Sequence, residues 1–335
     1  MALRFGINGL GRIGRALVRV ARTNPALELV AVNDPASPQQ IARLLRHDTV
    51  HGIYPGEVGW GEAGLRLDGR LVPQSRELEP AAIDWERHGV EIVVEATGRF
   101  RQRAAAAAHL GGRVRRVVVS ATVPDADATF CVGINDRSFD PARHVVLSNA
   151  SCTTNCLAPL LLVLDRAFGV DHALMNTVHC VTNSQNLVDM SHADPRRARA
   201  AVANIIPTTS DAIASIGWVM PEMAGRVEGL AMRVPIVAGS LVDLTVTLQR
   251  GATHDQVADA FRSAAHGDLG AILGVEEDEL VSSDFIGEKR SAVVDLPLLQ
   301  AAGDRLFRVV AWYDNEYGYT HRLVELLARV AAAGG

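Results

Sequence analysis

The sequence predicts an α/β fold with two domains, of which the first has a doubly wound parallel sheet and the second is an α+β domain with a mixed or antiparallel sheet. Residues 1–150 alternate short apolar strands with helices, which is the pattern of a parallel sheet. After residue 150 the strands are longer and the crossovers fewer. A chain of 335 residues also exceeds what one hydrophobic core usually holds. We therefore expect domains over 1–150 and 151–318, and a final helix over 319–333 that packs back on the first domain.

Composition and charge argue against several classes of protein. Hydrophobic residues make up 48% of the chain and charged residues 21%, as in an ordinary globular protein. The longest apolar run, 157–164, is far short of the roughly 18 residues that a membrane helix needs, and we expect no signal peptide. A net charge of −5 offers no basic face to nucleic acid or to a membrane. The four cysteines suit neither a disulfide framework nor a metal site, so we expect no metal and a reducing cytoplasm.

The start of the chain carries the pattern of a dinucleotide site. An apolar strand over 3–8 runs into a glycine turn and then a helix, and a second strand over 28–33 ends in Asp34. A carboxylate about twenty residues after the last glycine accepts hydrogen bonds from the adenosine ribose. A glycine turn alone can serve only to pack a helix on a strand, but here strand, turn, helix, strand and acid are in register. The sequence thus predicts a Rossmann domain, and the GxGxxG glycines are Gly9, Gly11 and Gly14.

Polar residues also follow later strands of this domain. Thr97 and Gly98 come after a strand over 91–95, and a strand that begins at Arg116 ends in Ser120. Residues at the carboxyl ends of such strands face the cofactor crevice, so these three are candidates for cofactor contact. Thr97 or Ser120 could instead be only a turn residue. A helix is expected between the two strands, over 101–110.

Cys152 is the candidate nucleophile. The strand over 145–148 is followed by Ser151, a good N-cap for an apolar helix, so the thiol lies at the helix N-terminus. There the helix dipole and the free N–H groups favour the thiolate and lower its pKa, and the thiolate is the form that attacks carbonyls. The alternative is that Cys152 is a small buried hydrophobic residue.

Three further residues are candidates from later in the chain. His179, inside a strand over 175–181, is a candidate base that would pair with Cys152, although a histidine in a strand is often structural. Arg233 closes another strand, and Arg197 lies in a polar stretch over 182–204. Guanidinium groups beside hydroxyls are what phosphate recognition needs, but the same pattern also describes an ordinary salt-bridged surface.

Four separated blocks of the chain resemble the phosphorylating glyceraldehyde-3-phosphate dehydrogenase family. They lie in the family's order within residues 4 to about 329, and they are 5–15, 148–156, 196–201 with 205–208, and 312–319. The resemblance implies a homotetramer that binds NAD. It also implies that Cys152 attacks an aldehyde, that hydride passes from the hemithioacetal to the nicotinamide, and that inorganic phosphate cleaves the thioester.

The resemblance also assigns residue roles. It makes His179 the base, and it makes Asn315 the partner of the nicotinamide carboxamide. Its other cofactor contacts are Arg12, Ile13, Asp34 and Ser120. For the substrate phosphate it implies Thr182 and Arg233, and for the attacking phosphate Ser151 and Thr153, which adds inorganic phosphate to the small-molecule substrate as a partner.

Three departures from the family pattern change what we expect. Ser210-Asp211 replaces Thr-Gly and sets a carboxylate beside an anion site, and Ser184 replaces an aspartate. Both raise a question about phosphate affinity, and Arg197 is a candidate to offset Asp211 by pairing with it. Met190-Ser191 replaces Leu-Pro, and if it reaches over from a neighbouring subunit its hydroxyl would allow weak use of NADP.

Two rival functions remain open on the sequence. An erythrose-4-phosphate dehydrogenase would share Cys152 and His179 but hydrolyse its thioester. A catalytically silent nucleotide-binding scaffold would have no use for a thiolate at a helix N-terminus. The block 182–185 resembles the glyceraldehyde-3-phosphate dehydrogenase family more closely than the erythrose-4-phosphate enzyme.

Overall fold

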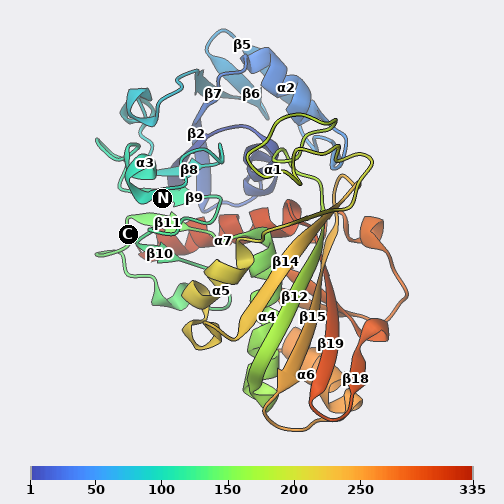
Figure 1. Ribbon diagram of the computed structural model, residues 1–335. Helices are drawn as coiled ribbons and strands as arrows, with labels where there is room; N and C mark the ends of the chain where they lie inside the picture. Colours follow the sequence, from blue (N-terminus) through green and yellow to red (C-terminus); the bar gives the residue numbers. More distant parts are fainter. Residues whose placement is uncertain (1, 334–335) are drawn as a thin grey trace. The chain divides into compact units, whose positions relative to one another are not determined.

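The computed structural model describes residues 2–333, which form two compact units (Figure 1). The first unit contains the chain up to Phe130, Asp136–Ala150, and the residues from Thr320 onward. The second unit contains Cys131–Asn135 and Ser151–Tyr319. The last helix, α7 (Tyr317–Ala333), therefore begins in the second unit and continues in the first. No helix in the described part of the chain is long and apolar enough to cross a membrane.

The first unit is built on a doubly wound sheet, as the sequence predicts. Its parallel strands are β10 (Ala128–Thr129), β11 (Val146–Ser148), β9 (Arg116–Val119), β8 (Ile92–Glu95), β1 (Leu3–Asn8), β2 (Leu27–Asn33) and β7 (Arg70–Ser75), in spatial order. The antiparallel strands β6 (Gly64–Leu67) and β5 (Val58–Gly61) extend it beyond β7. The strand order reverses between β1 and β8, which is where open sheets of this kind bind ligands.

The helices of the first unit begin where local sequence predicts. α1 (Arg12–Ala21) follows the glycine turn, and α2 (Pro38–Arg46) starts with a capping box between Ser37 and Gln40. The strands β3 (His47–Asp48) and β4 (Gly52–Ile53) form a small hairpin after α2. α3 (Arg103–Ala107) is shorter than the expected 101–110, because the backbone tightens into i to i+3 bonds at Ala108 and leads into glycines with positive φ.

The second unit contains a mixed sheet, again as predicted. Its strands, in spatial order, are β13 (Ile206–Thr208), β14 (Val227–Val234), β12 (Val170–Cys180), β15 (Ser240–Leu248), β19 (Leu306–Tyr313), β17 (Ala292–Asp295) and β16 (Leu273–Glu276), with β18 (Gln300–Ala302) beside β19. β12 pairs with β14 in parallel and with β15 antiparallel. The strict alternation of buried and partly exposed residues along β15 shows that only one face of the sheet is fully covered.

Helices cover that buried face. α4 (Cys152–Phe168) packs against β12 and β15, and α6 (His254–His266) packs against β16 and α4. α5 (Ala212–Val219) lies on α4 and β14. The sequence did not predict α5, because its residues are apolar on every side and therefore carry no helical period. β12 also begins five residues before the expected strand at Met175.

Candidate active site and cofactor site

Cys152 is the first residue of α4, and a strained turn sets it there. Ala150 has a φ of +55°, a left-handed value that residues other than glycine rarely adopt. Ser151 then caps the helix: its backbone is extended and its hydroxyl accepts from the N–H of Thr154 at 3.0 Å. The thiol is therefore held beside the helix N-terminus, as the N-cap residue predicts.

The second unit brings Cys152 and His179 together. Sγ of Cys152 lies 3.4 Å from Nε2 of His179, which is near the end of β12. The imidazole is buried and the cysteine half-buried. The ring of His179 meets the ring of Tyr313 edge-on, with centroids 5.9 Å apart. Nucleophile and candidate base are thus in reach of each other, which sequence separation alone could not test.

Tyr313 is a site residue that the sequence analysis did not single out. Its hydroxyl lies 3.0 Å from Oγ1 of Thr153 and 2.9 Å from Oγ1 of Thr177. It therefore connects β19 with α4 and β12 beside the ring of His179. The only signal in the sequence is its place within the block 312–319.

Arg233 contacts the other side of the imidazole. β12 and β14 pair so that His179 is in register with Arg233, and Nη1 of Arg233 lies 2.6 Å from Nδ1 of His179. The same Nδ1 lies 2.8 Å from the carbonyl oxygen of Cys180. When Arg233 donates to Nδ1, the ring proton is on Nε2; when Nδ1–H donates to Cys180, Nε2 is free to accept the thiol proton. The position of Arg233 therefore selects the tautomer.

The electrostatics correct the expectation of a depressed thiol pKa. Burial raises the pKa of Cys152, and the charge of Arg233 opposes that rise only in part. Burial and the nearby Arg233 charge lower the pKa of His179 to about 3. Burial therefore acts on the thiol against the helix N-terminus, and it keeps the imidazole of His179 neutral.

The candidate phosphate residues fall into separate groups within the second unit. Thr182 is held by Gln185, whose Oε1 accepts from its N–H at 2.9 Å. Nε of Arg233 is buried and, among the residues described, has no hydrogen-bond partner. A buried guanidinium N–H in that state is a donor available to an anion.

The expected pairing of Arg197 with Asp211 is wrong. Nε of Arg197 donates to Oγ1 of Thr208 at 2.8 Å and lies 3.4 Å from Oδ2 of Asp194. Asp211 instead precedes α5, where its carbonyl accepts from the N–H of Ser215. A shallow pocket does join the predicted Ser210 to a different arginine, and its polar lining residues are Asp194, Arg196, Thr208, Thr209 and Ser210.

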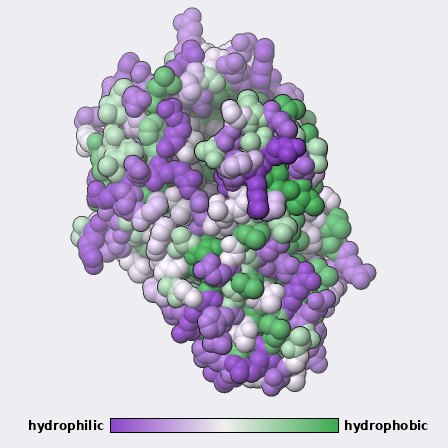
Figure 2. All heavy atoms as spheres, viewed as in Figure 1, coloured by the Kyte–Doolittle hydropathy of each residue, from purple (hydrophilic) through white to green (hydrophobic). Residues whose placement is uncertain are grey.

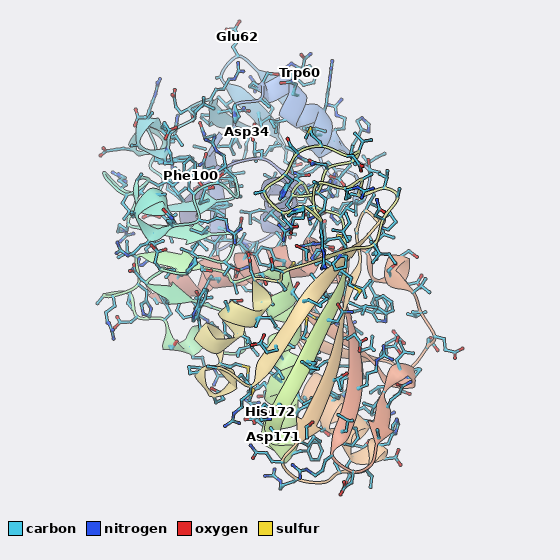
Figure 3. All side chains as sticks on the ribbon, in the orientation of Figure 1. Asp34, Trp60, Glu62, Phe100, Asp171 and His172 are labelled. Carbon is cyan, nitrogen blue, oxygen red and sulfur yellow. The ribbon has the colours of Figure 1, made fainter. Side chains whose placement is uncertain are left out.

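The first unit gathers the predicted cofactor residues at the carboxyl ends of its parallel strands. Asp34, labelled in Figure 3, follows β2, and its Oδ2 accepts from the N–H of Leu10 at 2.7 Å. Oδ1 of Asp34 accepts from the N–H of Ala36 at 2.9 Å. The carboxylate thus braces the glycine turn. Ser120, after β9, donates its backbone N–H to the carbonyl of Glu95 at 2.9 Å.

The glycine turn fits a dinucleotide. Gly9 has a φ of +95°, and a Cβ on Gly14 would lie 2.0 Å from the carbonyl oxygen of Gly9, so neither position admits a side chain. Gly11 is the N-cap of α1, where no side-chain cap and no acidic residue occupy the first turn. Such a helix start suits a pyrophosphate, and Ile13 is half-buried within it.

Other predicted contacts are already engaged in this structure. Nη1 of Arg12 pairs with Oδ2 of Asp48 at 2.5 Å. The hydroxyl of Thr97 donates to Glu95 and accepts from the N–H of Arg99, while Gly98 has a positive φ. Asn315 belongs to the second unit, where its Oδ1 lies 3.2 Å from Sγ of Cys180. Within residues 2–333, no group of three or more His, Cys, Asp or Glu is placed to hold a metal ion.

Fold and site together define a class of protein, a dinucleotide-binding oxidoreductase with a cysteine nucleophile and a histidine beside it. Two family models match the chain: the glyceraldehyde 3-phosphate dehydrogenase NAD binding domain over residues 3–103, and the C-terminal domain of the same enzyme over 151–315. The chain belongs to the glyceraldehyde 3-phosphate dehydrogenase family, as the sequence resemblance predicts. This is a family of NAD-dependent oxidoreductases that act on an aldehyde group, and NAD is the cofactor.

Curated relatives match over the whole length. The chain is 46% identical to glyceraldehyde-3-phosphate dehydrogenase 1 of Bacillus subtilis, with 100% of both chains covered. It is 47% identical to glyceraldehyde-3-phosphate dehydrogenase of Kitasatospora aureofaciens, covering 98% of this chain and 99% of the relative. It is 44% identical to the enzyme of that name from Geobacillus stearothermophilus, with 100% of both covered.

Proposed function

We propose that this protein is a phosphorylating glyceraldehyde-3-phosphate dehydrogenase, which oxidises glyceraldehyde 3-phosphate with NAD and inorganic phosphate to 1,3-bisphosphoglycerate. The observation that carries the proposal is the separation of 3.4 Å between Sγ of Cys152 and Nε2 of His179 at the N-terminus of α4. Full-length similarity to enzymes of that name supports the choice of substrate.

Cys152 and His179 then carry the covalent steps. His179 accepts the thiol proton at Nε2, and the sulfur attacks the aldehyde carbon. The protonated imidazole then gives that proton to the carbonyl oxygen, which completes the hemithioacetal and leaves Nε2 free to accept again. The backbone N–H of Cys152 stabilises the developing oxyanion. NAD supplies the hydride acceptor, and His179 takes the hydroxyl proton as the hemithioacetal becomes a thioester. A phosphate oxygen attacks the thioester carbon, the C–S bond breaks, and the acyl phosphate leaves with Cys152 restored.

The neutral imidazole of His179 gives Arg233 a part in these steps. While Arg233 donates to Nδ1, Nε2 carries the ring proton and cannot act as a base. A substrate phosphate that turns the guanidinium off Nδ1, while its charge stays beside the pair, lets the ring proton move from Nε2 to Nδ1, where it is donated to the carbonyl of Cys180. Nε2 then becomes the acceptor. The partnerless Nε of Arg233 supports an anion at this point, with Thr182 as the second proposed contact.

The remaining contacts are proposals of the same kind. For the attacking phosphate we assign Ser151 and Thr153, together with Ser210 of the shallow pocket. For the cofactor, Asp34 holds the adenosine ribose and Asn315 the nicotinamide carboxamide. The other proposed cofactor contacts are Gly9, Gly11, Arg12, Ile13, Gly14, Thr97, Gly98 and Ser120.

A homotetramer is the proposed assembly. The irregular segment over 182–205 exposes large apolar side chains, and Figure 2 shows hydrophobic groups among hydrophilic ones on the face in view. Leu187, Val188, Met190 and Ile205 are 62–68% exposed, as is Leu174 of β12 at 65%. Two separate apolar surfaces, this segment and the open face of the second sheet, suit a tetramer built from two kinds of self-complementary contact. The free thiols of Cys152, Cys156 and Cys180 favour a reducing cytoplasm.

The test is reduction of NAD with glyceraldehyde 3-phosphate or erythrose 4-phosphate, each with and without inorganic phosphate. We expect turnover that needs glyceraldehyde 3-phosphate and inorganic phosphate together, and loss of turnover in Cys152→Ser with NAD binding kept. Phosphate-independent oxidation of erythrose 4-phosphate would point to the rival enzyme. Binding of NAD with no turnover of either sugar would point to a silent scaffold.

A further inference from the structure

Glu95, the last residue of β8, is a buried carboxylate that the chemistry above does not use. Only 1% of its surface is exposed. Its Oε2 accepts from Nδ2 of Asn8 at 2.6 Å and lies 3.1 Å from Nε2 of His109. Its Oε1 accepts from both the hydroxyl and the N–H of Thr97, the latter at 2.8 Å. Burial of a carboxylate is costly, and four donors offset that cost.

The histidine in this cluster is neutral, and its tautomer is set by Trp85. The indole N–H is a donor only, and Nε1 of Trp85 lies 3.1 Å from Nδ1 of His109. Nδ1 therefore carries a lone pair, so the ring proton is on Nε2 and is donated to Glu95. The negative charge remains on Glu95, whose partners among the described residues include no arginine or lysine.

The hydrogen bonds continue across the carboxyl edge of the sheet. Oδ1 of Asn8, at the end of β1, accepts from Nδ2 of Asn33, at the end of β2, at 2.8 Å. Oδ1 of Asn33 in turn accepts from the hydroxyl of Ser75, the last residue of β7, at 2.8 Å. Four strand ends are therefore tied together at the edge that carries the glycine turn and Asp34.

The cluster touches the glycine turn through Thr97. A Cβ built on Gly9 would lie 2.8 Å from both the backbone nitrogen and Cγ2 of Thr97, so the two residues are packed backbone to side chain. Glu95 holds Thr97 by two hydrogen bonds, and it holds Asn8, the neighbour of Gly9, by a third. A shift of Glu95 would therefore displace both Asn8 and Thr97, the two residues that it holds next to Gly9.

We propose that Glu95 is a positioning residue for NAD, which fixes Asn8 and Thr97 so that the turn at Gly9 is formed before the dinucleotide arrives. Preorganisation of this kind lowers the free energy that binding must spend on ordering the site. The proposal depends on NAD binding to the first unit and is independent of the substrate proposed for Cys152.

Glu95→Gln tests it, because glutamine keeps the size but turns an NH₂ group toward donors. The full-length variant should bind NAD with a dissociation constant at least tenfold higher, measured by calorimetry without substrate. At saturating NAD, kcat and the KM for glyceraldehyde 3-phosphate should stay within twofold of wild type, and iodoacetamide should alkylate Cys152 at the wild-type rate. Glu91→Gln is the matched control: Glu91 immediately precedes β8, pairs with Arg115 at the surface, and should leave NAD affinity unchanged.

Thr97→Val is a second test of the proposal if Glu95→Gln fails to fold. It removes the hydroxyl bond to Glu95 at nearly constant volume, and it should raise the dissociation constant about threefold. Wild-type affinity for NAD in whichever variant folds would overturn the proposal. So would a parallel fall in kcat, NAD affinity and alkylation rate, because that result describes general destabilisation. An enzyme that fails to oxidise glyceraldehyde 3-phosphate, yet loses NAD affinity in Glu95→Gln, would reject the proposed function alone.

Discussion

Nη1 of Arg233 lies 2.6 Å from Nδ1 of His179, and the two residues are in register on the adjacent strands β14 and β12. This contact sets a permanent positive charge against the candidate base. It lowers the pKa of His179 further than burial alone would, and it acts against the rise that burial imposes on the pKa of Cys152. One side chain therefore acts on both members of the pair.

Removal of that charge should slow the nucleophile. In Arg233→Met the pKa of Cys152 should rise further, so alkylation by iodoacetamide at pH 7 should slow and its pH midpoint should move up by about one unit. Stopped-flow alkylation between pH 5 and 10 measures this. Arg226→Met is the control, because Arg226 donates to the carbonyl of Val170 at the far end of β12. Unchanged or faster alkylation in Arg233→Met would contradict the electrostatic assignment.

Acid should weaken the first unit through Asp48. Burial alone would raise the pKa of Asp48, but the hydrogen bonds from Arg12 and from the N–H groups of His51 and Val50 lower it to about 2. A carboxyl whose folded pKa lies below its unfolded value of about 4 adds stability above pH 4 and loses it as the pH falls toward 2. Solvent screening limits the effect to roughly 1 kcal/mol.

Asp48→Asn should therefore lower the free energy of unfolding at pH 7 by about that amount, and the difference from wild type should shrink at pH 3. Urea denaturation at the two pH values measures it. Asp255→Asn, an exposed site on α6, is the control. A difference that grows as the pH falls would have the wrong sign for this mechanism.

Phosphate affinity should rise when Asp211 loses its charge. Arg197 contacts Asp194 and Thr208 and therefore does not neutralise Asp211. A carboxylate within roughly 6 Å of a bound phosphate repels it by about 1 kcal/mol, which corresponds to several-fold in affinity. Asp211→Asn should lower the KM for inorganic phosphate by that factor, measured at saturating NAD and aldehyde. An unchanged or higher KM would show that Asp211 points away from the anion.

NAD should be preferred over NADP, with weak but measurable use of the latter. The Asp34 carboxylate accepts hydrogen bonds from the ribose diol of NAD and therefore repels the 2′-phosphate of NADP. One hydrogen bond from the hydroxyl of Ser191 would stabilise that phosphate by only about 0.5 to 1.5 kcal/mol. Ser191→Pro should reduce kcat/KM with NADP selectively. Asp34→Asn should narrow the gap between the cofactors, but it should also weaken NAD, because Asp34 braces the turn through Leu10 and Ala36. A preference of the wild-type enzyme for NADP would show that the repulsion by Asp34 does not outweigh the hydrogen bond from Ser191.

Sequence alone was enough wherever neighbours in the chain decide the structure. Ser151 caps α4 through the N–H of Thr154, three residues on, and the glycine turn after β1 depends on backbone freedom at Gly9 and on close packing at Gly14. Such features depend on residues a few positions apart in the chain, so they can be predicted from the types of those residues. The parallel direction of the strands in the first unit follows from the same alternation of strand and helix, whereas their spatial order comes from the structure.

Only the tertiary structure decided how distant groups act on one another. Cys152 and His179 are 27 positions apart, and Arg233 is 54 beyond the histidine. The register of β12 with β14 sets the Arg233 contact, and burial raises the pKa of the Cys152 thiol, where the helix N-terminus alone would lower it. The same holds for Glu95, whose donors come from β1, from the turn after β8 and from His109. Desolvation and long-range hydrogen bonds depend on every element packed around a group. A local sequence pattern therefore cannot predict their combined effect.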